Sequence, residues 1–143
     1  FIPLSELPAC VLDFYRKNMK HSPPEGFYCA MGNNLYYLPE PPPSVDGLKI
    51  ARLGLFLGAI KGKAFKPSHP FVPAQEKDAF QRYLHLSPGE SDLRKYLRGE
   101  TLLRDSAEDG LTAVCADSFP LGWGSSAGGV IKNMYPKGWR RMD

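Results

Sequence analysis

Apolar residues at helical spacing near the N-terminus predict a first helix over residues 5–19. Ser5 is a candidate N-cap, because its hydroxyl can accept a hydrogen bond from a backbone N–H of the first turn. The residues expected to share the buried face are Val11, Leu12, Tyr15 and Met19. The segment from Asn18 to Pro24 should end this helix.

Two short apolar segments then predict a β-hairpin. Residues 27–31 and 35–38 flank Gly32-Asn33-Asn34, which has the composition of a tight turn. Pro39 should end the second strand, since proline cannot donate a hydrogen bond to a sheet. The run Pro41-Pro42-Pro43 is expected to form an extended linker or surface loop.

Residues 48–60 are apolar and interrupted by glycine, and we interpret them as sheet, not helix. A bend or bulge is expected near Gly54 or Gly58. Lys61-Gly62-Lys63 should form a basic turn, and prolines between residues 65 and 73 predict irregular structure with room for a short helical turn. The alternating apolar residues behind the strand prediction are Leu53, Leu55 and Leu57.

The clearest local signal in the second half is Ser87-Pro88-Gly89-Glu90, which has the pattern of a helix capping box. Leu93, Tyr96 and Leu97 would form the apolar face of that helix. Gly99 is suited to the left-handed residue that ends it.

Three strands should follow as an antiparallel meander. Residues 111–116 are expected to form the first strand, and residues 117–124 a turn into the second. Gly128-Gly129 then introduces the third strand at Val130-Ile131.

Composition sets broad limits on the fold and its setting. With 143 residues, 43% of them hydrophobic, the chain can bury one core or two small lobes. A net charge of +3 does not by itself indicate a polyanionic partner. No segment reaches the ~20 apolar residues that span a bilayer, and Phe1 begins no signal-peptide pattern. We expect a cytoplasmic protein without a membrane partner, and a first residue other than Met favours a fragment.

Few residue groups suggest catalysis or metal binding. Cys10, Cys29 and Cys115 are far apart and form no zinc motif, so reduced core thiols are expected. The acidic residues between positions 105 and 109 have turn composition. The histidines, His21, His69 and His85, are isolated from one another and from acidic residues. We expect no catalytic residue and no metal site.

Several segments taken in order resemble a known family. They are Leu35-Tyr36-Tyr37-Leu38-Pro39, Lys49-Ile50-Ala51-Arg52-Leu53-Gly54, Phe65-Lys66-Pro67-Ser68, Tyr96-Leu97-Arg98-Gly99-Glu100-Thr101, Leu121-Gly122-Trp123-Gly124, Gly129-Val130-Ile131-Lys132-Asn133 and Tyr135-Pro136-Lys137-Gly138-Trp139-Arg140. Through these segments the chain is similar to the C-terminal region of RsmF-type (Sun family) ribosomal RNA 5-methylcytosine methyltransferases, whose last domain is PUA-like. One departure is Ser125-Ser126-Ala127, where family members commonly have a basic residue.

The resemblance implies an α+β fold in two parts. Residues 1–73 would form a small helix-hairpin lobe, and residues 74–143 a PUA-like β-pseudobarrel that binds RNA. In the family, a separate Rossmann-like domain binds S-adenosylmethionine and uses two cysteines. This sequence contains neither cysteine motif, so the resemblance implies no cofactor and no catalytic domain in this chain.

The function implied is therefore recognition of ribosomal RNA for a methyltransferase domain of the same protein, an rRNA (cytosine-C5)-methyltransferase. We expect a monomer. The alternative is a structural lobe that docks on the methyltransferase domain without gripping RNA.

The densest basic and aromatic group lies at the C-terminus. Its cations can neutralise phosphates, and its rings can stack on unpaired bases. Alternatively, the rings seal the end of the barrel and the charges are simply solvated. The residues concerned are Lys132, Tyr135, Lys137, Trp139, Arg140 and Arg141.

Lys61 and Lys63 are candidates to extend the same RNA-binding surface. The competing explanation is a lysine-rich turn that protects a sheet edge from pairing with other chains.

Overall fold

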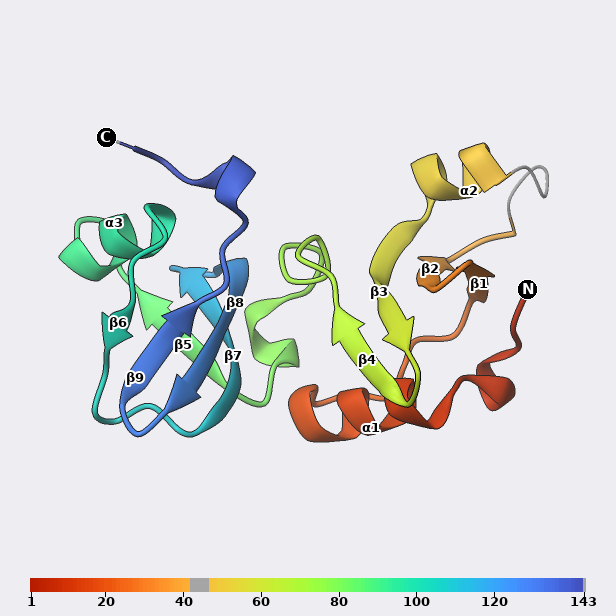
Figure 1. The fold of residues 1–143 in the computed structure, drawn as a ribbon, viewed down its shortest axis with the longest axis horizontal. Helices are drawn as coiled ribbons and strands as arrows, with labels where there is room; N and C mark the ends of the chain where they lie inside the picture. Colours follow the sequence, from red (N-terminus) through yellow and green to blue (C-terminus); the bar gives the residue numbers. More distant parts are fainter. Residues whose placement is uncertain (42–46, 143) are drawn as a thin grey trace. The chain divides into compact units, whose positions relative to one another are not determined.

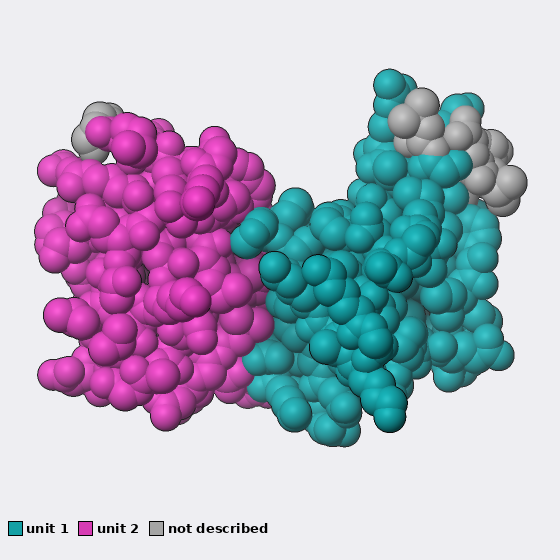
Figure 2. Space-filling model, in the orientation of Figure 1, with its two compact units in different colours: residues 1–71 teal, residues 72–143 magenta. Residues whose placement is uncertain are grey.

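The computed structural model describes residues 1–41 and 47–142, and the chain forms two compact units (Figure 1 and Figure 2). Unit 1 comprises residues 1–71 and unit 2 residues 72–143, whereas the sequence suggested a division after residue 73. Each unit has its own sheet and buried side chains, and the α+β class is confirmed. Pro42 and Pro43 of the expected linker lie outside the described residues.

Unit 1 is an antiparallel sheet in the order β1-β2-β3-β4, joined by two α-helices. The hairpin expected around Gly32 is confirmed, because Met31 pairs with Asn34. The elements are η1 (Leu4–Glu6), α1 (Ala9–Asn18), β1 (Phe27–Met31), β2 (Asn34–Leu38), α2 (Gly47–Leu53), β3 (Leu55–Lys61) and β4 (Ala64–Pro67).

Helix α1 begins later than predicted. Ser5 lies in the short η1 turn and does not cap a helix. Proline disfavours helical backbone in the residue before it, so Leu7 stays extended and α1 starts only after Pro8. The helix buries Val11, Phe14 and Tyr15, whereas Leu12 is 41% exposed. The centroid of the Phe14 ring lies 5.2 Å from that of Phe65 and 5.5 Å from that of Phe71, and these contacts fix α1 against one face of the sheet.

The interpretation of residues 48–60 as sheet alone was wrong. Residues 47–53 form α2, which buries Ile50 and leaves Leu53 59% exposed. Leu55 and Leu57 do lie in a strand, β3, so the sheet prediction is confirmed from residue 55 onward. Gly54 ends the helix by donating its N–H to the Ile50 carbonyl at 2.8 Å. The bulge expected near Gly58 is confirmed, since Leu57 is the extra residue between the pairs Tyr36–Phe56 and Leu35–Gly58.

Residues 61–67 extend the sheet. Lys61 pairs with Ala64 across the turn at Gly62, as the basic turn predicted. Residues 65–67 belong to β4, so this segment is more regular than expected. Pro67 is tolerated because it occupies the last position of an edge strand, where its missing N–H costs little.

Unit 2 is a five-stranded sheet in the order β5-β7-β8-β9-β6, shown in Figure 1 curling around α3. The meander β7-β8-β9 is confirmed. Most of the turn expected at residues 117–124 is strand instead. The strand accommodates Pro120 because this residue, which pairs with Cys115, lies at a β-bulge. Strands β5, parallel to β7, and β6 were not predicted. The elements are η2 (Lys77–Ala79), β5 (Tyr83–Leu86), α3 (Ser91–Leu97), β6 (Leu102–Leu103), β7 (Gly110–Ala116), β8 (Phe119–Ala127), β9 (Val130–Asn133) and η3 (Lys137–Trp139).

Helix α3 starts after the predicted capping box, at Ser91. Gly89 has φ +94, a left-handed conformation that no helix interior accepts. Ser87-Pro88-Gly89-Glu90 is instead a β-turn, in which the Glu90 N–H donates to the Ser87 carbonyl at 3.1 Å. The Glu90 carboxylate still accepts from the Ser87 N–H, so the expected side-chain contact forms without the helix.

The predicted C-terminus of α3 is confirmed at Gly99, whose φ is +91. The Gly99 N–H donates to the Tyr96 carbonyl and the Glu100 N–H to the Lys95 carbonyl, both at 2.9 Å, which is a Schellman motif. A Cβ at Gly99 would lie 2.5–2.7 Å from the Arg140 side chain. This glycine therefore permits both the left-handed turn and the approach of the C-terminal segment.

We expect Gly99→Ala to lower the free energy of unfolding more than Gly89→Ala does. Both substitutions place a Cβ in left-handed backbone, at a cost of about 1–2 kcal/mol. Only Gly99 has a neighbour to displace, since nothing lies within 4 Å of a Cβ at Gly89. Urea unfolding of the two variants measures the difference, and equal losses would contradict the close packing of Arg140.

Candidate nucleic-acid interface

The C-terminal segment of unit 2 folds back onto α3. The centroid of the Tyr135 ring lies 5.1 Å from that of Tyr96 and 5.8 Å from that of Trp139. The Arg141 N–H donates to the Leu97 carbonyl at 2.8 Å. The end of the chain is thus attached to the end of the helix by rings and by backbone.

Tyr96 anchors this arrangement from the core. Its ring is fully buried among residues of β5, β6, β7 and β9, and its hydroxyl donates to the Trp123 carbonyl at 2.9 Å. Burial raises the pKa of Tyr96 well above its usual range, so the phenol stays neutral and keeps the proton that it donates to Trp123.

Asn133 links the end of β9 to the same helix. Its side-chain amide donates to the carbonyls of Tyr96 and Glu100, at 2.9 and 2.8 Å, and its Oδ1 accepts from the Tyr135 N–H at 2.8 Å. One side chain therefore fixes both the helix terminus and the start of the C-terminal segment.

Arg140 is held in the same junction. Its Nε donates to the Tyr135 carbonyl at 3.2 Å, and its side chain covers Gly99. Half-buried and engaged with backbone, Arg140 has a structural role in addition to its charge.

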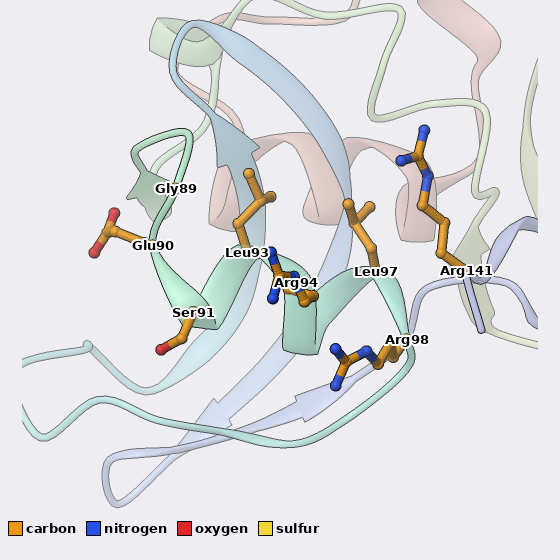
Figure 3. A pocket seen from close by; sticks show the side chains of 8 residues that line it. All are labelled: Gly89, Glu90, Ser91, Leu93, Arg94, Leu97, Arg98 and Arg141. Carbon is orange, nitrogen blue, oxygen red and sulfur yellow. The ribbon is translucent and has the colours of Figure 1, made fainter. Parts of the chain in front are cut away.

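A groove of about 450 Å³ runs along α3 (Figure 3). Arg94 and Arg98 reach it from the helix, and Arg141 from the C-terminal segment. All three arginines are exposed. The remaining lining residues are Gly89, Glu90, Ser91, Leu93 and Leu97.

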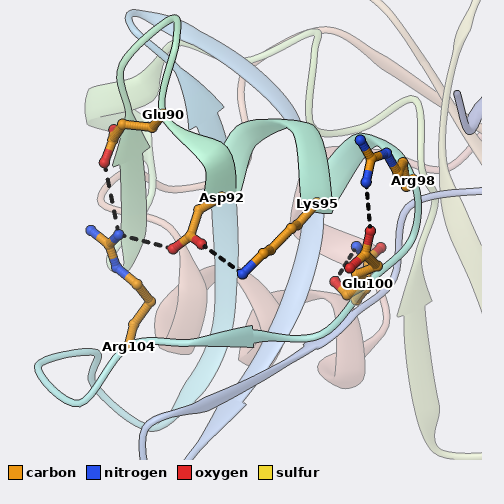
Figure 4. A network of polar contacts seen from close by, with 7 residues as sticks. Glu90, Asp92, Lys95, Arg98, Glu100 and Arg104 are labelled. Atoms are coloured by element: carbon orange, nitrogen blue, oxygen red, sulfur yellow. Dashed lines mark hydrogen bonds and ion pairs between the residues drawn. The ribbon is translucent and has the colours of Figure 1, made fainter. Parts of the chain in front are cut away.

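The acidic side chains near the groove are paired with cations, one of which is the groove residue Arg98 (Figure 4). Arg104 contacts Glu90 at 3.9 Å and Asp92 at 3.2 Å. Lys95 lies 4.0 Å from Asp92, and Arg98 lies 3.4 Å from Glu100. Among the described residues, Arg94 and Arg141 form no ion pair, so their charges are available to an anion.

The structure gathers only some of the predicted site residues. Tyr135, Trp139, Arg140 and Arg141 come together beside α3, and Lys137 is exposed on η3. Lys132 follows Ile131, which is buried in the core cluster, so strand alternation puts Lys132 on the opposite face of β9.

Lys61 and Lys63 lie in unit 1, at the turn between β3 and β4. Both side chains are exposed. Neither lysine lines the groove beside α3.

Arg94 and Arg98 were missed from the sequence. Arg94 lies on α3 and Arg98 is the C-cap residue four positions later, a spacing that places two side chains on one helix face. This signal was present in the sequence, but the proximity of Arg141 depends on the fold.

Other kinds of site find no support among the described residues. No group of three or more His, Cys, Asp or Glu side chains lies close enough to hold a metal ion. None of the helices in the described part of the chain is long and apolar enough to cross a membrane.

Two family models match the chain, one over each half. The model described as "RsmF rRNA methyltransferase first C-terminal domain" matches residues 13–74, and that described as "Methyltransferase RsmF PUA domain" matches residues 77–141. The chain belongs to the RsmF family. Unit 1 corresponds to the first C-terminal domain of RsmF and unit 2 to its PUA domain, which confirms the resemblance and the PUA-like fold. No curated protein matches the chain.

The chain has three free cysteines, and we expect Cys115 to be the least reactive. Its side chain is fully buried, and burial raises its pKa to about 11, so little thiolate forms at pH 8. Cys10 and Cys29 are half-buried. Titration with a thiol reagent should modify these two first and Cys115 only on unfolding in urea. Equal rates for all three thiols in the folded protein would contradict the buried position.

Proposed function

We propose that this chain is the RNA-binding portion of an S-adenosylmethionine-dependent rRNA 5-methylcytosine methyltransferase. It would hold ribosomal RNA so that a catalytic domain elsewhere in the same protein reaches its cytosine. Tethering the substrate raises its local concentration at the reacting centre and fixes its orientation. Membership of the RsmF family, through both matched domains, supports this proposal.

The arginine-lined groove beside α3 is the observation that carries the proposal. Guanidinium groups bind phosphate oxygens through paired N–H donors, and such contacts set the register of a nucleic acid. Arg94 and Arg141 present these donors at the groove while nearby carboxylates are occupied by Arg104 and Lys95. Phosphates therefore meet positive charge with little acidic competition.

The two C-terminal rings have different roles in this proposal. Tyr135 packs against the core through Tyr96, so we assign it a structural role. Trp139 is 42% exposed and contacts Tyr135 at its edge, which leaves part of the indole accessible to stack on an unpaired base.

A second candidate function is docking on the methyltransferase domain without direct RNA contact. Leu103 and Val130 favour it, because they are paired neighbours on β6 and β9 and are 74% and 44% exposed. Adjacent exposed apolar side chains suit a protein surface better than a phosphate backbone. The two functions use different faces and can be separated by substitution.

We expect Arg94→Gln, Lys137→Gln and Arg141→Gln together to weaken binding to a structured ribosomal RNA fragment. Each lost phosphate contact lowers the slope of log K against log salt by about 0.9 on a duplex and about 0.7 on a single strand. Fluorescence anisotropy across a salt series measures both affinity and slope. Arg140 is left intact because its contacts with Tyr135 and Gly99 are structural.

The matched control removes three charges from the end of α1 and the segment that follows it, as Arg16→Gln, Lys17→Gln and Lys20→Gln. A specific interface requires the groove variant to lose more affinity and more slope than this control. Equal effects, or no RNA binding by the unmodified chain at low salt, would refute the RNA-binding function. In that second case, Leu103→Ser and Val130→Ser should impair association with the separately expressed methyltransferase domain.

A further inference from the structure

The net positive charge of the chain comes from unit 1. Residues 1–71 contain eight Lys and Arg against five Asp and Glu, whereas residues 72–143 contain ten of each. Between residues 47 and 75 there are five Lys and Arg and no acidic residue. The PUA unit is neutral overall, so unit 1 supplies the long-range attraction for a polyanion.

The cations of unit 1 that belong to the sheet share a face. Lys66 pairs with Ala59, and Lys61 pairs with Ala64. Side-chain alternation therefore places both lysines on one side of the sheet as diagonal neighbours, whose Cα atoms are typically about 7–8 Å apart. Between them lie two alanines, whose small side chains leave the backbone open to approach. Lys63 extends from the adjoining turn.

This face is the one that α1 does not cover. Helix α1 packs through Phe14 against Phe65, whose neighbours along β4 are Ala64 and Lys66. Strand alternation then points Phe65 toward α1 and Lys66 away from it. Lys61, Lys63 and Lys66 are all exposed and form no ion pair with any described residue.

An aromatic pair lies on the same face. Tyr36 and Phe56 are cross-strand partners, with ring centroids 5.3 Å apart and planes inclined by 33°. Asn34, two residues before Tyr36 on β2, pairs with Ala59, which connects this aromatic pair to the lysine side of the face. Both rings are half-buried, so each retains accessible surface.

We propose that this sheet face of unit 1 binds an unpaired RNA segment, with phosphates on Lys61, Lys63 and Lys66 and a base stacked on the Tyr36–Phe56 pair. Rings combined with cations on a β-sheet suit single strands, since unpaired bases expose their faces and duplexes do not. The proposal rests on the proposed RNA-binding function and adds a second contact surface that selects unpaired nucleotides.

The competing explanation for these lysines is protection of the β4 edge against pairing with other chains. That explanation assigns no role to Tyr36 and Phe56. It predicts aggregation of lysine variants with no change in the affinity of the monomer for RNA.

The experiment measures binding of the full 143-residue chain to a labelled oligouridylate and to an RNA hairpin duplex, across a salt series. One variant carries Lys61→Gln, Lys63→Gln and Lys66→Gln. The control, called the α1 control, carries Arg16→Gln and Lys17→Gln on α1 and Lys20→Gln just after it. A second variant carries Tyr36→Leu and Phe56→Leu, which keeps apolar volume and removes both rings. Urea unfolding checks that each variant is folded.

We expect the lysine variant to bind the oligouridylate more weakly than the control, with a salt slope reduced by about 2 for three lost phosphate contacts. The ring variant should lose at least about fivefold in affinity for the oligouridylate, the lower end of a base-stacking contribution. Its affinity for the duplex should not change.

Two results would overturn the inference. If the lysine variant matches the α1 control, or if the ring variant binds the oligouridylate as tightly as the unmodified chain, this face is not the binding surface. Loss of binding in the Arg94, Lys137 and Arg141 variant alone would leave the proposed function standing without this second surface. Failure of the unmodified chain to bind either RNA would instead refute the proposed function itself.

Discussion

The left-handed turn at Gly99 determines where the C-terminal cations of unit 2 lie. It ends α3 through two backbone hydrogen bonds and leaves space for the Arg140 side chain over the turn. Asn133 reinforces it by donating to the carbonyls of Tyr96 and Glu100. Without this junction, the last residues of the chain would have no fixed position relative to the helix.

The groove follows from that junction. Arg141 reaches α3 because its N–H donates to the Leu97 carbonyl. Arg94 lies on the helix and Arg98 at its C-cap. Glu90 and Asp92 are paired with Arg104 and Lys95, and Glu100 with Arg98, which leaves Arg94 and Arg141 as the groove arginines without an ion pair to a described residue. A unit with no net charge can thereby present a positive surface, because the placement of its charges matters more than their sum.

Sequence reasoning succeeded where local chemistry decides structure. The hairpin at Gly32 and the helix end at Gly99 each depend on a glycine with positive φ, and the bulge lies next to Gly58, where a Cβ would clash with β4. It failed at α2. The seven residues of this helix are compatible with helix or strand, and the burial of Ile50 in the tertiary structure decides between the two. The groove depends on contacts between residues more than forty positions apart, which periodicity cannot reveal.

The central claim is that both units contact RNA, through the α3 groove and through the lysine and aromatic face of unit 1. The most direct test is a two-dimensional NMR titration of the isotopically labelled chain with a ribosomal RNA fragment that contains unpaired nucleotides. We expect amide shifts in residues 94–100 and 137–141 and, separately, in residues 56–66. Shifts confined to Leu103 and Val130, or no shifts at low salt, would contradict this account.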